Sequence, residues 1–418
     1  MPAAPSRERT DILIAGASFA GLALARALIS AFGCDIRVTI VDRAARKETR
    51  GPDARAFALS AGARRMLDTL GIWQAVAASA EPVTDIEITD SNLDAGVRPV
   101  LLHYDNRLDG NDGTSEPATH IVPAHELEQA LWSSVASDPS LTLLAPAEIL
   151  TFTDAGSATT AVLADGREIA APLLVGAEGR RSPSRDGARI GTVGWRYGQT
   201  ALVTTIAHDR PHGGRAIQHF LPAGPFAILP LPGNRSCLTW TEDAEEAKRI
   251  MALDDAGFLV EIETRVAGRL GTIEVVGPRQ TWPLEMHLAR AYVAPRFALI
   301  GDAAHGVHPI AGQGANLAFR DAAALSEVIA DAMRLGLDPG SMQILSRYQT
   351  WRRFDSFASA ATFDGLNKLF SNDNTFVRAA RDFGLGVVER LPAVKRALVS
   401  EAAGVTGDLP RLFKSERL

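Results

Sequence analysis

The sequence predicts an α/β protein in which a parallel-sheet domain is interrupted by a mainly antiparallel β domain and followed by a helical C-terminal region. Two strand–glycine turn–helix patterns, one at the start of the chain and one over residues 297–332, predict the parallel sheet. Between them, residues 200–240 form short apolar segments separated by Pro- and Gly-containing turns, which is typical of antiparallel strands. The expected boundaries are 1–80, 120–190 and 285–340 for the parallel-sheet domain, 81–119 and 191–284 for the β domain, and 341–418 for the helical region.

The chain begins with the strand–turn–helix–strand order that binds dinucleotides. An apolar strand over residues 11–15 leads into a turn and a helical pattern over residues 22–32, and a second strand, residues 37–41, ends in an acid. In such units glycines allow the tight turn, the helix N-terminus receives the pyrophosphate, and the acid holds ribose hydroxyls. The residues expected to contact the dinucleotide here are Gly16, Ser18, Gly21, Asp42 and Arg43.

The same turn has a second interpretation, because Ser18 stands where the dinucleotide motif has its middle glycine. Gly16-x-Ser18-x-Ala20 between a strand and a helix loosely resembles the nucleophile elbow of hydrolases. That elbow normally follows several strands that build the sheet and the oxyanion hole, and here only a short polar segment precedes it. The nucleotide interpretation is therefore preferred.

The segments between the two glycine patterns contain both helices and strands. Helical patterns are expected at residues 61–70, 124–137 and 256–267, and the dipeptide Asp165-Gly166 predicts a hairpin. Residues 105–116, rich in Asp, Asn and Gly, are expected to form an exposed loop. His208 and His212 flank a turn and are expected to be solvated, and residues 341–418 to be mostly helical with a polar end.

The second strand–loop–helix joint is the most informative part of the chain. Apolar residues 297–300 end at a Gly-Asp pair that includes Asp302, and a glycine-rich loop then leads into an alanine-rich helix over residues 315–332. Asp302 can accept hydrogen bonds from sugar-type hydroxyls, and the free N–H groups of the helix start can face an oxygen that gains negative charge. The loop and helix start are expected to contribute Gly312, Gln313, Gly314, Ala315 and Asn316.

These segments, in this order, resemble the class A flavoprotein monooxygenases, which are aromatic hydroxylases with one FAD. The three matching elements are residues 16–21, 173–185 and 301–314. Within that family the chain is most similar to the ubiquinone-biosynthesis hydroxylases, and residues 53–60, 308–321 and 352–385 carry this likeness. The resemblance covers essentially the whole chain, although Glu178 stands where the family more often has aspartate.

The resemblance implies a reaction in which the cofactor carries the chemistry. NAD(P)H reduces FAD, the reduced flavin takes up O2 as a C4a-hydroperoxide, and the distal oxygen passes to an electron-rich aromatic ring. It also implies FAD contacts at Arg55, Glu178 and Gly179, and it places Pro309 against the ring system, where it shapes the oxygen pocket. No amino acid is assigned as the catalytic group. A second strand–glycine loop–helix unit is not evident in the sequence, which fits transient binding of the nicotinamide.

The expected function is hydroxylation of a prenylated phenol or benzoquinol in ubiquinone biosynthesis. One alternative is a hydroxylase of a small soluble aromatic compound. Another is a non-catalytic flavoprotein scaffold within a quinone-biosynthesis complex, whose proteins are also candidate partners of an active enzyme. Consumption of NADPH with O2 and a phenol would separate the enzyme from the scaffold.

Composition restricts the partners and the compartment. The formal net charge of −6 provides no basic field for nucleic acid. The two cysteines, Cys34 and Cys237, suit a reducing cytoplasm rather than a disulfide framework. Asp302, His305 and His308 are spaced three apart, but a strand-to-loop junction is a poor zinc site, so no metal is expected.

No secretory signal or bilayer-spanning stretch is evident in the sequence, so a cytoplasmic protein is expected. Peripheral contact with the inner face of the cytoplasmic membrane stays open. The best candidate for such contact is the C-terminal part, where apolar and basic residues are interleaved, although core packing is the plainer explanation for any one of them. The residues concerned are Phe370, Phe376, Arg378, Arg381, Phe383, Leu385, Val387, Val388, Arg390 and Leu391.

Overall fold

The computed structural model describes residues 7–44, 53–91, 93, 99–109, 114–308, 312–370 and 390–418. One part of the structure is organised around a six-stranded sheet in the order β11-β3-β2-β15-β23-β22. All neighbouring strands in this sheet are parallel except the last pair. The strands are β2 (Ile12–Ala15), β3 (Val38–Val41), β11 (Leu141–Leu144), β15 (Leu173–Gly176), β22 (Val293–Ala294) and β23 (Phe297–Leu299).

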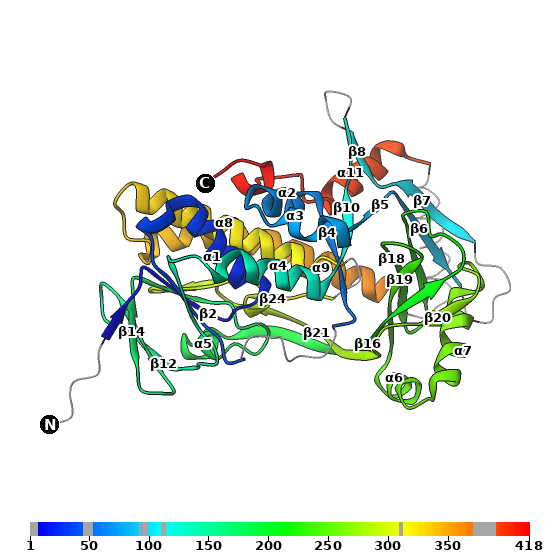
Figure 1. Cartoon of the computed structure of the whole chain (residues 1–418), viewed down its shortest axis with the longest axis horizontal. Helices are drawn as coiled ribbons and strands as arrows, with labels where there is room; N and C mark the ends of the chain where they lie inside the picture. The colour runs from blue at the N-terminus through cyan, green and yellow to red at the C-terminus, as the bar shows by residue number, and fades with distance from the viewer. Residues whose placement is uncertain are drawn as a thin grey trace.

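The six-stranded sheet is the middle layer of three (Figure 1). The helices that cover one face are α1 (Phe19–Phe32), α4 (Ala124–Ala136) and α8 (Gly314–Arg334). Helix α1 begins three residues before the expected range because Ser18, as its N-cap, accepts a hydrogen bond from Gly21 N. On the other face lies a four-stranded sheet of β1 (Arg7–Arg9), β12 (Ile149–Asp154), β13 (Thr159–Leu163) and β14 (Glu168–Ala171). The hairpin expected at Asp165-Gly166 joins β13 to β14 and is confirmed.

The other part of the structure is built on a nine-stranded sheet. This sheet is mainly antiparallel, as expected, although β17 pairs with β6 in parallel. Helices α6 (Ala244–Met251) and α7 (Asp255–Val266) cover its outer face, where Trp240 and Phe258 belong to a separate apolar core (Figure 1). The strands are β6 (Asp85–Asp90), β7 (Val100–Asp105), β16 (Thr192–His208), β17 (Arg215–Leu221), β18 (Gly224–Leu231), β19 (Arg235–Asp243), β20 (Ile273–Val275), β21 (Gln280–Ala289) and β24 (His305–Gly306).

The remaining elements are smaller sheets and helices that lie outside the two large sheets. They comprise the three-stranded sheet of β4 (Ala56–Ser60), β10 (Thr119–Pro123) and β5 (Glu81–Val83), the pair β8 (Arg107–Asp109) and β9 (Ser115–Pro117), and the helices α2 (Ala61–Thr69), α3 (Trp73–Val76), α5 (Pro183–Gly187), α9 (Met342–Phe370) and α11 (Pro392–Ala402). The described residues also form four 3-10 turns: η1 (Gly33–Asp35), η3 (Ala77–Ser79), η4 (Gly301–Ala303) and η6 (Arg411–Lys414).

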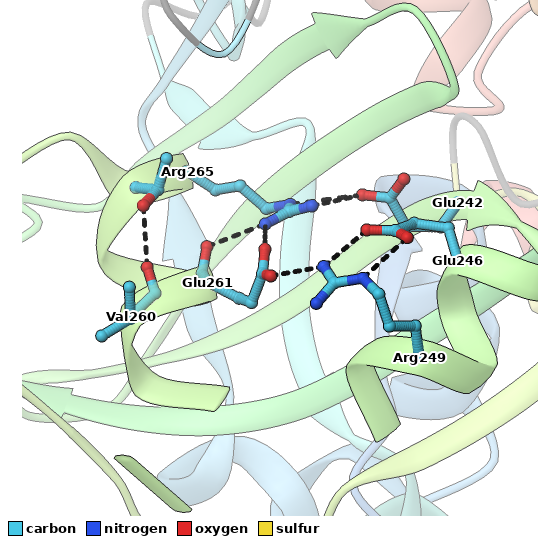
Figure 2. Close-up of polar contacts among 7 residues, drawn as sticks. Glu242, Glu246, Arg249, Val260, Glu261 and Arg265 are labelled. Atoms are coloured by element: carbon cyan, nitrogen blue, oxygen red, sulfur yellow. Dashed lines mark hydrogen bonds and ion pairs between the residues drawn. The ribbon is translucent and has the colours of Figure 1, made fainter. Parts of the chain in front are cut away.

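A buried ion-pair network fixes α6 and α7 to the nine-stranded sheet (Figure 2). Arg265, which is 3% exposed, contacts Glu242 of β19 at 2.7 Å and Glu261 at 2.6 Å. Arg249 extends the network toward solvent by pairing with Glu246 at 2.6 Å and with Glu261 at 2.5 Å. Burial raises the pKa of the Glu242 carboxyl, and the neighbouring Arg265 opposes that rise. The inner part of the network therefore depends on a charge pair shielded from water.

Three local expectations were wrong, and in the second and third a contact with a distant segment decides the structure. The 105–116 segment contains the paired strands β8 and β9 instead of a simple loop. His208 is buried, with Nε2 3.0 Å from Ser236 Oγ, whereas a solvated side chain was expected. The C-terminal end is not simply polar, because Leu412 and Phe413 are buried and Phe413 packs where a Cβ on Gly62 would lie.

We expect His120 to make the fold acid-sensitive. Burial, aided by the positive charge of Arg64, lowers the pKa of His120 from 6.5 to about 4, and its ring lies edge-on to Trp73. As pH falls from 6.5 toward 4 the unfolded chain binds this proton before the folded chain does, so stability is lost across that window. His120→Phe keeps an aromatic ring and removes the titration. Its melting temperature should therefore fall less than that of the wild type over the same pH range, and equal pH slopes would contradict this assignment.

Candidate functional site

The segments singled out in the sequence meet at one edge of the six-stranded sheet. Strands β2, β15 and β23 are parallel neighbours, so their carboxyl ends lie at the same edge. Gly16 follows β2, Glu178 follows β15 and Asp302 follows β23. From β2 the chain first adds β3 and β11 on one side of the sheet, and it later adds β15 and β23 on the other side of β2. The strand order therefore changes direction between β2 and β15. Ligands of open α/β sheets bind at such a switch point.

The turn after β2 passes directly over the end of β15. Gly16 has a φ of 105°, and a Cβ at this position would lie 2.5 Å from the carbonyl oxygen of Ala177. A Cβ on Gly21 would in turn collide with the carbonyl oxygen of Gly16. Ser18, which replaces the middle glycine, uses its hydroxyl as the helix cap, 3.2 Å from Gly21 N. The turn is therefore tight enough to start α1 at the sheet edge, where the N–H groups of a helix can receive an anion.

Asp42, at the end of β3, organises the neighbouring turns. Its Oδ2 accepts a hydrogen bond from Ala17 N at 2.7 Å and its Oδ1 accepts one from Ala44 N at 2.8 Å. A carboxylate has about four acceptor positions, so both oxygens can still accept from hydroxyl donors. Arg43 is exposed and lies 3.9 Å from Glu148.

Glu178 supports the local fold as well as lying at the site. Its Oε2 accepts hydrogen bonds from Ser184 N at 3.0 Å and Ser182 Oγ at 2.7 Å, and also from Ser184 Oγ. These contacts fix the start of α5 beside the end of β15. A contact with a ligand would therefore use Oε1. Gly179, the next residue, has a φ of 79° and open space where a Cβ would lie.

Asp302 occupies η4, directly after β23. Its side chain is exposed, and none of the described residues donates a hydrogen bond to its carboxylate. The main chain around it is fixed: the Asp302 carbonyl lies 2.8 Å from His287 Nε2, and Gly301 has a φ of 59°. The main chain of Asp302 is thus fixed while its carboxylate remains available. This arrangement fits the role expected from the sequence, in which the carboxylate accepts hydrogen bonds from sugar-type hydroxyls.

The start of α8 lies against β4. The Asn316 side chain accepts a hydrogen bond from Ser60 N and donates one to the carbonyl of Ala58, both at 2.9 Å, and it also donates to Gln313 Oε1. Gly312 has a φ of 61° and passes close to Ala58. Asn316 therefore ties the helix to β4 through its side chain, while the first N–H groups of α8, at Gly314, Ala315 and Asn316, have no partner within the helix. Pro309, also predicted here, lies outside the described residues.

Arg55 lies just before β4 and is partly exposed. It forms an ion pair with Asp53 at 2.6 Å and stacks over the rings of Phe57 and Trp282 at 5.6 Å and 5.0 Å. Phe57 itself packs edge-on to Phe19 at the start of α1. These contacts place the guanidinium between the nine-stranded sheet and the glycine turn.

The histidines next to Asp302 have structural partners. His305 Nε2 lies 2.6 Å from Asp321 Oδ2, and both side chains are almost wholly buried. His308 packs edge-on to Tyr197, with 5.0 Å between ring centroids, and burial lowers the pKa of His308 to about 4. Over the residues with a described placement, no group of His, Cys, Asp and Glu side chains is arranged to hold a metal ion.

Comparison with known proteins identifies the family. A family model described as "FAD binding domain" matches residues 9–359. The chain is 41% identical to "Ubiquinone hydroxylase UbiL" of Rhodospirillum rubrum over 97% of this chain and 92% of that protein. It is 31% identical to "3-demethoxyubiquinol 3-hydroxylase" of Escherichia coli, over 96% of this chain and all of that protein. The structure of PqsL, described as a probable FAD-dependent monooxygenase from Pseudomonas aeruginosa, superposes with a TM-score of 0.76 at 23% identity, covering 90% of this chain and 99% of that one.

The family match and these relatives show that the protein is an FAD-dependent monooxygenase, and FAD is its cofactor. The chain belongs to the FAD-binding-domain family and, within it, to the ubiquinone-biosynthesis hydroxylases. The family resemblance and the fold class expected from the sequence are thereby confirmed. In the portion of the chain with described coordinates, no helix is long and apolar enough to cross a membrane.

Proposed function

We propose that this protein hydroxylates the aromatic ring of a prenylated ubiquinone precursor with O2 and NAD(P)H. The observation that carries the proposal is the meeting of Gly16, Glu178 and Asp302 at the ends of three adjacent parallel strands, in a chain 41% identical to a protein named a ubiquinone hydroxylase. The exposed Asp302 carboxylate and the Cβ-free surface at Gly16 fit a dinucleotide with hydroxyl and pyrophosphate groups. Bound FAD would supply electron transfer from the nicotinamide and activation of O2.

The described residues support a division of roles around FAD. Gly16, Ser18 and Gly21 place the N-terminus of α1 at the pyrophosphate. Asp42 and Arg43 lie toward the ribose, and Asp302 accepts from the hydroxyls of the flavin side chain. The remaining residues assigned to the cofactor surface are Arg55, Glu178, Gly179, Gly312, Gln313, Gly314, Ala315 and Asn316. Pro309, which lies outside the described residues, is assigned to shaping the flavin pocket.

The first turn of α8 has an electrostatic role in this proposal. Its N–H groups and the positive end of the helix dipole favour negative charge on the flavin ring, which develops when the ring is reduced. The Asn316 side chain contributes by holding that turn against β4. The nicotinamide is bound transiently. The domain division proposed from the sequence assigns FAD to residues 1–80, 120–190 and 285–340, and the aromatic substrate to 81–119 and 191–284.

A prenylated substrate favours an enzyme that acts at a membrane surface. About 0.8 kcal/mol is lost for each CH2 equivalent that leaves the bilayer, so capture of a long prenyl chain from water is unfavourable. Leu391, a described residue of the proposed contact region, is 45% exposed and caps α11. Helix α11 lies at the outer edge of the protein (Figure 1) and adds the exposed apolar residues Val394 (38%) and Leu398 (53%). Lys395 and Arg396 lie on the same helix. Of the other residues named for this contact, Phe376, Arg378, Arg381, Phe383, Leu385, Val387 and Val388 lie outside the described residues, as does the side chain of Phe370.

Liposome flotation tests this contact. We expect the wild type to float with vesicles that contain anionic lipid, and a Val394→Asp/Leu398→Asp double variant that retains FAD to remain at the bottom of the gradient. Leu335→Asp is the control, since Leu335 is 74% exposed and follows α8 rather than α11. A wild type that never floats would instead favour delivery of substrate by proteins of a quinone-biosynthesis complex.

Profiling of quinone precursors in cells that lack the protein tests the proposed reaction. We expect one prenylated ring that lacks a single hydroxyl to accumulate, and expression of the wild type to remove it. An unchanged precursor profile would contradict the proposal. If a scaffold role were correct, a variant that binds no FAD would restore the profile as well as the wild type does.

A further inference from the structure

The backbone that carries Asp302 is held by buried side chains from four separate elements. Tyr348 Oη of α9 donates a hydrogen bond to the carbonyl of Leu299 at 2.8 Å, and Gly301 N donates to Asp321 Oδ2 of α8 at 3.0 Å. His287 Nε2 of β21 lies 2.8 Å from the carbonyl of Asp302, and Arg185 Nη1 of α5 donates to the carbonyl of Ala303 at 3.2 Å. We call Tyr348, Asp321, His287 and Arg185 the turn clamp.

Every member of the turn clamp is removed from solvent. Tyr348 and Asp321 are fully buried, and Arg185 and His287 are 7% and 9% exposed. A buried polar side chain that bonds to backbone is costly to leave unpaired, so such contacts favour one backbone position strongly. The clamp therefore fixes the main chain on both sides of Asp302 without using the Asp302 carboxylate itself.

Asp321 is the centre of the clamp. Besides Gly301 N, its Oδ2 accepts from His305 Nε2 at 2.6 Å, and its Oδ1 accepts from Arg352 Nε at 2.8 Å. Burial alone would raise the pKa of Asp321, but His305 and Arg352 outweigh it and lower that pKa, so the carboxylate is ionised and can serve three donors. An asparagine has a single amide oxygen for these donors.

Arg352 continues the contacts away from the turn. It pairs with Asp355, which in turn pairs with Arg320 at 3.0 Å. Asp355 is thus part of the same ion-pair cluster as Asp321, but no hydrogen bond or ion pair joins it to the described residues 299–303. Tyr292 offers a similar comparison for Tyr348: it is 1% exposed in the same region, and no hydrogen bond joins its hydroxyl to the turn.

We propose that Asp321 and Tyr348 are positioning residues for FAD, which act by holding the Leu299–Ala303 backbone so that the Asp302 carboxylate meets the cofactor. This inference rests on the proposed role of Asp302. Neither side chain needs to touch FAD. Loss of either contact lets the turn shift, and a displaced carboxylate accepts more weakly from the cofactor hydroxyls, since hydrogen-bond strength falls steeply with poor geometry.

Titration of FAD into the full-length protein stripped of its flavin tests this inference. For Asp321→Asn we expect the Kd for FAD to rise by about tenfold or more, and for Tyr348→Phe by about threefold. Asp355→Asn and Tyr292→Phe are the matched controls, and both should bind FAD within about twofold of the wild type even if their melting temperatures fall. A purely structural role would lower the stability of Asp321→Asn and Asp355→Asn alike and leave both Kd values unchanged.

Asp302→Ala separates failure of the clamp from failure of the site. If this variant binds FAD like the wild type, the proposed role of Asp302 is wrong, and the clamp inference fails with it. If Asp302→Ala binds poorly while Tyr348→Phe and Asp321→Asn bind like the wild type, the site stands and the clamp is overturned. Should Asp321→Asn not fold, Tyr348→Phe against Tyr292→Phe still decides the question, because both exchanges remove only one oxygen.

Discussion

Asp302→Ala is expected to leave the purified protein largely without FAD. The exposed carboxylate has no donor among the described residues, so it is available to accept charge-assisted hydrogen bonds from cofactor hydroxyls. Loss of such a bond costs about 1.5–3 kcal/mol, which corresponds to a rise in Kd of about tenfold to a hundredfold. The flavin absorbance per protein after gel filtration measures the effect.

Two variants define the origin of that loss. Asp302→Asn keeps an acceptor oxygen and removes the charge, so its flavin content should lie between those of wild type and Asp302→Ala. Asp35→Ala is the control, because Asp35 is an exposed carboxylate in η1, which precedes β3 at the opposite, amino-terminal edge of the sheet. Wild-type flavin content in Asp302→Ala would refute the assignment.

Arg265→Met is expected to cost about 3–5 kcal/mol of unfolding free energy, because it leaves Glu242 buried without its partner. The Glu242 side chain is 7% exposed, and the Arg265 guanidinium also lies 6.0 Å from the Trp240 ring centroid. Methionine retains most of the apolar stem, so the change reports chiefly on the lost charge. Urea unfolding followed by tryptophan fluorescence measures the free energy.

The outer arginine of the same network supplies the control for this prediction. Arg249 pairs with Glu246 and Glu261, but its side chain is 49% exposed (Figure 2). Solvated ion pairs contribute little to stability, so Arg249→Met should lower the unfolding free energy far less than Arg265→Met does. Equal losses in the two variants would show that burial does not govern the strength of this network.

The sequence predicts those parts of the site that depend on local geometry. The turn at Gly16 and the Gly-Asp pair at Asp302 follow from short strands, glycines and helix starts that are adjacent in the chain. That both lie at one sheet edge follows from the rule that parallel strands share their carboxyl ends. The contacts of Asp302 with its surroundings come from distant segments and have no local pattern.

The turn clamp shows why the other contacts of the site could not be predicted from the sequence. Tyr348 and His287 lie in segments with no motif, and Arg185 stands out in the sequence only as part of the 173–185 segment that resembles the family. Asp321 lies within the resemblance around the α8 start, yet its bond to Gly301 depends on how α8 packs against β23. The hydrogen bonds by which Glu178 holds the start of α5 are likewise not evident in the sequence, because serines four and six residues after an acid occur in many loops.

Isotopically labelled O2 tests the central claim of an FAD-dependent ring hydroxylase most directly. Purified protein with FAD, NAD(P)H and a short-chain prenylated phenol should yield a hydroxylated ring that contains one labelled oxygen atom, as measured by mass spectrometry. The same phenol without its prenyl chain should be a poorer substrate. Unlabelled product, or NAD(P)H consumption with no hydroxylated product from either phenol, would contradict the account. Faster turnover of the unprenylated phenol would replace the lipid substrate with a small soluble aromatic one.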